Sequence, residues 1–183
     1  VGDKNLAVVS LIFAACTWGF FWVNWPFGKL FLGDGGAYFL GFALGWIAVL
    51  LVERNPSVSA FSALLICILP ITEVVFSIFR RKVRNEDPGK PDSLHFHSLL
   101  QRRYVSKWFA KQPTLARNSF VGVFMGLMSL VPAFVANLIY DTTIYCVVTS
   151  LLFALGYVAV FARMARHHWC SPIGFLILKP TKV

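Results

Sequence analysis

The sequence predicts an all-α protein that crosses a membrane with about five helices. Of its 183 residues, 57% are hydrophobic and only 14% are charged, whereas a soluble domain carries about 25% charged residues. The mean hydropathy of +0.68 agrees with this deficit. These values exclude an ordinary water-soluble fold, and the four scattered cysteines exclude a scaffold held together by disulfides.

Five apolar segments reach or approach the length of about 20 mostly apolar residues that a helix needs to cross a bilayer. They cover residues 6–23, 36–52, 58–79, 118–139 and 143–164. An odd number of crossings would place the two termini on opposite sides. We therefore expect a single membrane domain over residues 1–183, a polytopic transmembrane helix bundle with one long cytoplasmic loop at 80–117.

The distribution of basic residues predicts the orientation of this bundle. Lysine and arginine are retained in cytoplasmic loops, and one orientation places all but two of the 17 basic residues on that side. The two exceptions are Lys4 and Arg54. We expect an external N-terminus and a cytoplasmic C-terminus, and we attribute the net charge of +9 to topology rather than to nucleic-acid binding.

A glycine-rich turn with one carboxylate precedes the second apolar segment. The stretch 24–38 contains Asn24, Lys29 and Asp34 among small and turn-forming residues. The backbone can approach a bound group closely there, and Mg²⁺ prefers one or two carboxylates together with phosphate oxygens. Two interpretations stay open: Asp34 is a metal ligand, or it caps the helix that begins at Gly35 or Gly36.

A second polar stretch, 91–98, lies on the long loop and contains Asp92, His95 and His97. Imidazoles at i and i+2 can bind phosphate, coordinate a metal, or serve as acid and base. The alternative is a pair of solvated loop histidines. Farther along the loop, Leu100, Tyr104 and Trp108 recur at i, i+4 and i+8 among basic residues, which predicts a short amphipathic helix at the level of the lipid headgroups.

Glu73 is an ionisable residue inside the third apolar segment, three residues after Pro70. A charge within a bilayer is costly and usually faces a polar interior, so it indicates a functional site. The structural alternative is an interhelical hydrogen bond or a pairing with a nearby basic group. Pro70 lacks a backbone donor and can kink this segment.

These motifs resemble, in order and spacing, those of the polyprenyl-phosphate N-acetylhexosamine-1-phosphate transferases, also called glycosyltransferase family 4. The family includes the enzymes that start O-antigen and enterobacterial common antigen, and the phospho-N-acetylmuramoyl-pentapeptide translocase. Residues 24–37 are similar to its N-x-P…F-(L/M)-G-D-x-G-(S/A) pattern, and residues 92–97 to its D-x-x-H-L-H-H loop. Ser98 departs from this pattern at a histidine, and Glu73 replaces the aspartate common in the sugar-transferase branch.

The resemblance implies a phosphotransferase of the bacterial inner membrane. It would transfer N-acetylhexosamine-1-phosphate from a UDP-N-acetylhexosamine to undecaprenyl phosphate at the cytoplasmic face, release UMP, and so initiate cell-surface polysaccharide or cell-wall synthesis. GlcNAc is favoured as the sugar because the loop reads His-Phe-His-Ser rather than a run of adjacent histidines. The implied partners are both substrates and the lipid bilayer, with a homodimer left open and no nucleic acid.

The resemblance also implies roles for individual residues. Asp34 would be a catalytic residue and the ligand of Mg²⁺, or of Mn²⁺ in its place, and His95 and His97 would be the other catalytic residues. Further contacts with substrate would come from Asn24, Lys29, Arg80, Arg81 and Asp92.

The chain lacks the paired Asp-Asp motif and the Asn- and Asp-rich segment that the family carries in its N-terminal half. We therefore expect this chain to be the C-terminal half of such an enzyme and to be incomplete on its own. Two hypotheses from other classes are kept beside this one. The chain is a non-catalytic membrane fragment, or it is a transporter subunit that uses Glu73 as an ion site.

Overall fold

A computed structural model describes residues 2–85 and 94–166 of the chain. This described part is built from helices and contains no strand. In chain order the helical elements are α1 (Lys4–Asn24), α2 (Gly33–Arg54), α3 (Ala60–Ile66), α4 (Ile68–Val83), α5 (Phe96–Leu100), the π-helix η1 (Gln101–Val105), α6 (Ser106–Trp108), α7 (Thr114–Ile139) and α8 (Thr143–Arg166). The predicted all-α class is confirmed.

Four of these helices, α1, α2, α7 and α8, are long and apolar enough to cross a membrane. Each covers one of the apolar segments expected from the sequence. α1 and α2 bury almost none of their residues inside the protein. A helix that is apolar all round and not buried in protein is typical of a membrane span, so the chain is a multi-pass membrane protein.

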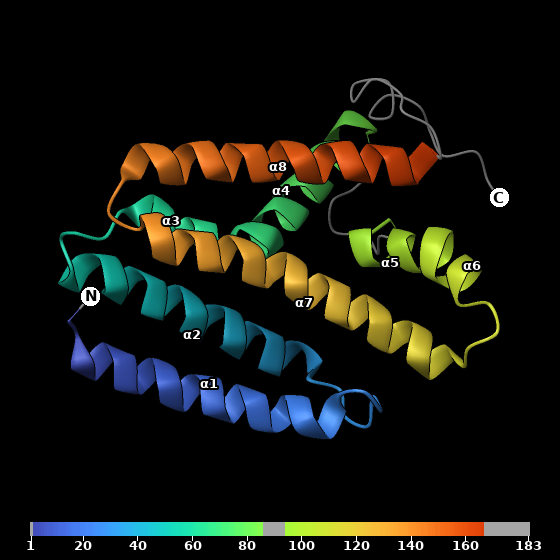
Figure 1. Ribbon diagram of the computed structural model, residues 1–183, viewed down its shortest axis with the longest axis horizontal. Helices are drawn as coiled ribbons and strands as arrows, with labels where there is room; N and C mark the ends of the chain where they lie inside the picture. The colour runs from blue at the N-terminus through green and yellow to red at the C-terminus, as the bar shows by residue number, and fades with distance from the viewer. Residues whose placement is uncertain (1, 86–93, 167–183) are drawn as a thin grey trace.

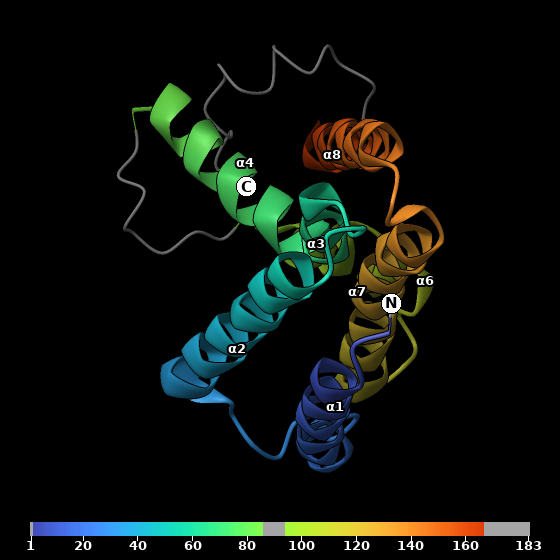
Figure 2. The same cartoon turned by 90° about the vertical axis from the view of Figure 1, so that its left-hand side faces the viewer.

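The third expected span, 58–79, is not one straight helix. α3 ends at Ile66, α4 begins at Ile68, and the two are bent by 79°, so that α4 leaves the bundle obliquely (Figure 2). Pro70 explains the position of this break, because it has no N–H to donate to the Ile66 carbonyl and its ring would clash there. The helical bonding resumes where the Ile71 N–H donates to the Cys67 carbonyl at 3.2 Å.

The ends of the helices gather at two ends of the bundle (Figure 1). One end, here called the polar end, contains the turn between α1 and α2, the C-terminal end of α4, the run from α5 to α6, the start of α7 and the end of α8. The start of α1, the end of α2 and the turn between α7 and α8 lie at the opposite end. Residues far apart in the sequence therefore share one end of the molecule.

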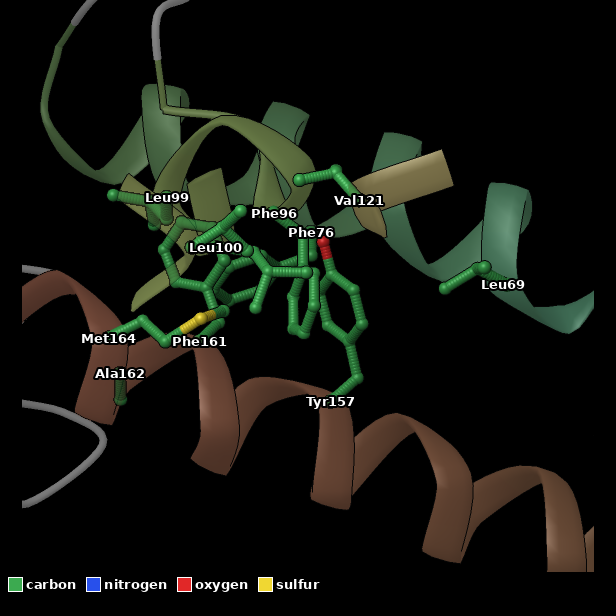
Figure 3. Packing of buried hydrophobic residues seen from close by; sticks show 11 residues of the cluster. Leu69, Phe76, Phe96, Leu99, Leu100, Val121, Tyr157, Phe161, Ala162 and Met164 are labelled. Atoms are coloured by element: carbon green, nitrogen blue, oxygen red, sulfur yellow. The ribbon is translucent and has the colours of Figure 1, made fainter. Parts of the chain in front are cut away.

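The largest buried cluster lies at the polar end, between α4, α5 and α8 (Figure 3). Its members are Leu69, Phe76, Phe96, Leu99, Leu100, Val105, Val121, Tyr157, Phe161, Ala162 and Met164. The histidine motif at 95–97 runs directly into this cluster, so the loop that carries it is packed against protein.

The amphipathic helix expected around Leu100, Tyr104 and Trp108 exists but packs differently. It is a continuous run of α5, η1 and α6, and it buries Leu100 and Val105 inside the protein, whereas Trp108 is exposed. The π-helical turn explains the difference, because its wider turn shifts the positions that face inward. Val105 therefore takes the core position that a regular helix would give to Tyr104, and the expected placement of this face at the headgroups is wrong for Leu100.

Candidate functional site

The middle residue of the His95-Phe96-His97 motif fixes the position of the motif. The side chain of Phe96 is 1% exposed, and its ring stacks on that of Tyr157 in α8 with 5.1 Å between centroids. His95 is the N-cap of α5, and His97 follows one residue after Phe96. Their side chains are 39% and 51% exposed. The backbone is thus anchored while both imidazoles reach the surface.

A carboxylate from α4 lies beside both imidazoles. Oε1 of Glu73 is 3.5 Å from Nδ1 of His95 and 3.9 Å from Nδ1 of His97. The same oxygen accepts a hydrogen bond from the backbone N–H of Phe96 at 3.3 Å. The two rings are nearly parallel, with 5.7 Å between their centroids. We call Glu73, His95 and His97 the Glu73–histidine cluster.

Arg80 supports the same loop from a buried position. Its side chain is 1% exposed, its Nη1 donates to the Leu94 carbonyl at 3.0 Å, and its guanidinium lies 5.2 Å from the centre of the Phe161 ring. Arg81, which follows it, is also buried. Arg80 thus supports the loop through its backbone at Leu94. The contacts of Arg80 and Arg81 with substrate stay predictions.

The turn between α1 and α2 is shaped by Asn24 and by glycine. Oδ1 of Asn24 accepts a hydrogen bond from the backbone N–H of Leu30 at 3.3 Å. Gly28 and Gly33 have φ values of 59° and 67°, a region that other residues adopt only under strain. Lys29 is exposed within this turn, and its ammonium lies 5.2 Å from the centre of the Phe27 ring. Asn24 therefore holds the turn closed, and Lys29 stands on its surface.

Asp34 lies in the first turn of α2 and is exposed. The helix begins at Gly33, with Leu32 as N-cap and no side-chain capping bond, so the interpretation of Asp34 as a helix cap is wrong. A carboxylate in this position is still favoured by the positive end of the helix dipole. Within the described residues its carboxylate has no hydrogen bond or ion pair, and it is open to a ligand.

The first turn of α2, which carries Asp34, and the start of α5, which His95 caps, both lie at the polar end (Figure 1). The structure brings Glu73 and the two histidines into contact, but it shows no bond between them and Asp34. Within residues 2–85 and 94–166, no group of three or more His, Cys, Asp or Glu side chains could hold a metal ion. The predicted contact at Asp92 lies outside the described residues.

The residues around Asp34 fit the requirements of Mg²⁺ in one respect. This ion is usually bound through one or two carboxylates, with phosphate oxygens and water completing its octahedral shell. An exposed and uncapped carboxylate in a glycine-rich turn can supply one such ligand. Asp34 could therefore supply one ligand, and the binding of Mg²⁺ or Mn²⁺ by this residue stays a prediction.

The sequence did not indicate two features of the site: the contact of Glu73 with the histidines and the contact of Tyr157 with Phe96. The position of Glu73 inside an apolar segment marked it as unusual, but nothing in its spacing indicated that it meets the histidines. Tyr157 gave no signal at all, because it lies in an apolar stretch of α8. Tyr157 reaches the ring of Phe96 only because α8 packs against α5.

An apolar hollow of about 590 Å³ opens between α2 and the bend formed by α3 and α4. Small and aliphatic residues make up most of its lining, from Gly41 to Ile71, and Glu53 also lines it. None of the predicted site residues lines it. The hollow is therefore separate from the polar end.

Residues 1–52, which include the turn around Asp34, match the profile of a family described as glycosyl transferase family 4. The resemblance to this family is confirmed. No solved structure matches the chain.

Curated relatives agree with this family and bear the name undecaprenyl-phosphate alpha-N-acetylglucosaminyl 1-phosphate transferase. The chain is 36% identical to the one from Haemophilus influenzae over 81 residues, which are 42% of this chain and 23% of the relative. It is 34% identical to the one from Thermotoga maritima over 108 residues, 59% of this chain and 33% of the relative. It is 27% identical to the one from Escherichia coli K12 over 152 residues, 79% of this chain and 41% of the relative. The chain therefore matches less than half the length of these relatives.

Proposed function

We propose that this chain is part of a membrane enzyme that transfers GlcNAc-1-phosphate from UDP-GlcNAc to undecaprenyl phosphate and releases UMP. The observation that carries this proposal is that the turn around Asp34 and the His95–His97 pair, the two motifs of the family, lie at the same end of the bundle. The names of the relatives support the acceptor and the transferred group. Because the matches cover less than half of each relative, the activity is assigned to the whole protein that contains this chain.

The chemistry of this reaction suits the groups at the polar end. A lipid phosphate that attacks a diphosphate brings many negative charges together, and positioned positive groups lower the barrier by neutralising them. Bound Mg²⁺, held by Asp34, would supply part of that neutralisation. His95 and His97 have Nδ1 toward Glu73, which leaves Nε2 of each ring for the diphosphate. Asn24, Lys29, Arg80, Arg81 and Asp92 are proposed to complete the contacts with substrate.

The proposed setting is the inner membrane of a bacterium, with the polar end in the cytoplasm. The concentration of lysine and arginine in the segments of this end supports that orientation. The N-terminus would then be external and the C-terminus cytoplasmic. Such an enzyme would initiate the synthesis of a cell-surface polysaccharide.

The contacts of Glu73 favour this function over an ion-transporting subunit. An intramembrane ion site needs a carboxylate that is free to exchange its ion along a polar path. Oε1 of Glu73 instead accepts a backbone hydrogen bond from Phe96 and faces two imidazoles of the loop. The contacts of Glu73 are thus with the histidine loop at the polar end, and they do not form an ion path through the membrane.

The test is the release of UMP from UDP-GlcNAc in membranes supplied with undecaprenyl phosphate and Mg²⁺. We expect release by a longer protein that includes this chain and not by the 183-residue chain alone. Asp34→Asn should lower the rate by about 100-fold or more, the loss typical of one removed electrostatic stabiliser. Failure of every longer protein to release UMP, or full activity of Asp34→Asn, would overturn the proposal.

Asp3 offers a matched control at the opposite end of the bundle. Its Oδ1 caps α1 by accepting from the Leu6 N–H at 3.0 Å, and its Oδ2 lies 3.0 Å from Nε of Arg54. Asparagine also caps helices well. Asp3→Asn therefore removes a carboxylate in the same way as Asp34→Asn, but it should leave UMP release unchanged.

A further inference from the structure

A single carboxylate oxygen of Glu73 faces three groups of the histidine loop. The backbone N–H of Phe96 is 3.3 Å from it, and the Nδ1 atoms of His95 and His97 are 3.5 and 3.9 Å from it. The Glu73 side chain is only 20% exposed. Charges in such a partly dry site interact more strongly than they do in bulk water.

We propose that Glu73 is a positioning residue, which holds both imidazoles with Nδ1 toward α4 and Nε2 toward a bound nucleoside diphosphate. This inference rests on the proposed function for the identity of the ligand. The orientation of the rings is a property of the chain itself and can be tested separately.

The geometry explains how one carboxylate can orient two rings. A carboxylate only accepts hydrogen bonds, so the imidazole nitrogen that faces it is favoured to carry a proton. The distances to both Nδ1 atoms exceed those of a good hydrogen bond, and the effect on the rings is therefore mainly that of charge. In a neutral imidazole with the proton on Nδ1, Nε2 is left as the acceptor. In the charged ring both nitrogens carry protons, and this is the form in which Nε2 can donate to a diphosphate oxygen.

Two further contacts fix the backbone that carries the rings. Phe96 lies between the histidines in the chain, and its buried ring fixes the backbone of the motif. Arg80 donates to the Leu94 carbonyl just before His95. With the backbone held on both sides, the rings have χ rotations as their main remaining freedom, and the charge of Glu73 selects among those.

Two substitutions of Glu73 separate the backbone contact from the charge. Glu73→Gln keeps the length of the side chain and an oxygen that can accept from the Phe96 N–H, but it removes the charge and adds an NH₂ donor that can face Nδ1. Glu73→Ala removes both contacts. Glu53→Gln is the matched control, because Glu53 is an exposed glutamate near the opposite end of α2.

The first measurement is the tautomer of each imidazole, read from ¹⁵N chemical shifts of ¹⁵N-histidine-labelled chain in lipid nanodiscs at a pH where the rings are neutral. His167 and His168 are replaced by asparagine so that only His95 and His97 report. We expect the proton on Nδ1 in the unsubstituted chain and in Glu53→Gln, and a shift to Nε2 in Glu73→Gln. Amide hydrogen exchange over 94–100 should stay slow in Glu73→Gln and become faster in Glu73→Ala.

The second measurement is UMP release by the longer protein. Glu73→Gln should lower kcat about 10-fold or more with little change in KM, because misoriented groups act on the reaction more than on binding. Protons on Nε2 in the unsubstituted chain, or the same tautomers in Glu73→Gln, would overturn the positioning role. Absence of UMP release with the expected tautomers would instead overturn the proposed function and leave the orientation of the rings established.

Discussion

The ring of Phe96 stacks on the ring of Tyr157, with 5.1 Å between centroids and 29° between planes. Phe76 of α4 meets the same tyrosine edge-on, at 5.9 Å and 78°. Three helices that are distant in the sequence thus share one aromatic contact (Figure 3). The placement of His95 and His97 depends on α8, although α8 contributes no polar group to the cluster.

Truncation of Phe96 should destabilise the polar end strongly. Phe96→Ala removes a ring that is 1% exposed, and such a change in a core costs about 3–5 kcal/mol in the free energy of unfolding. Phe96→Leu keeps part of the apolar contact and should therefore cost less than Phe96→Ala. Unfolding in mixed micelles with increasing SDS measures both values. A Phe96→Ala variant as stable as the unsubstituted chain would show that the ring is not a core residue.

Arg80 should be required for the order of the loop, whether or not it also meets a substrate. Arg80→Ala removes the donor to the Leu94 carbonyl, and a hydrogen bond from a charged group contributes about 1.5–3 kcal/mol. We expect faster amide exchange over 94–100 and lower stability. Arg80→Lys should rescue only part of this, because an ammonium cannot reproduce the planar guanidinium over Phe161.

Lys82 is the control for Arg80, since it is a basic residue on the same helix but is exposed. Lys82→Ala should leave amide exchange over 94–100 unchanged. A slow-exchanging loop in Arg80→Ala would contradict the assignment of Arg80 as a buried support.

The positions of the spans could be predicted because crossing a bilayer imposes a local requirement on about 20 consecutive residues. The polar end could be predicted for a similar reason, since basic residues are restricted by topology segment by segment. Hydropathy could not show that residues 58–79 form two helices at 79°. Pro70 indicated a kink, but the direction of α4 depends on packing against α8.

The contact between Glu73 and the histidines follows from the direction that α4 takes after the bend. In a straight span Glu73 would point into the bilayer, and the hypothesis of an ion site depends on that direction. The bend and the buried ring of Phe96 bring the loop back over the carboxylate. Hydrophobic periodicity could not predict the π-helical turn at Gln101–Val105 either, because it assumes one constant number of residues per turn.

The orientation of the bundle can be tested by labelling single cysteines in a background without native cysteines. Lys111 is an exposed residue between α6 and α7 at the polar end, and Asp141 is an exposed residue in the turn between α7 and α8 at the opposite end. With the polar end in the cytoplasm, an impermeant maleimide should label Lys111→Cys only in inside-out vesicles. It should label Asp141→Cys only in right-side-out vesicles.

The two substitutions should not themselves change the orientation. Lys111 is one of many basic residues in its loop, and acidic residues such as Asp141 contribute little to topology. The reverse labelling pattern would place the Glu73–histidine cluster outside the cell, away from a cytoplasmic UDP-sugar. That outcome would exclude the proposed reaction while leaving the helical fold intact, so the labelling tests the function through the side of the membrane on which it must occur.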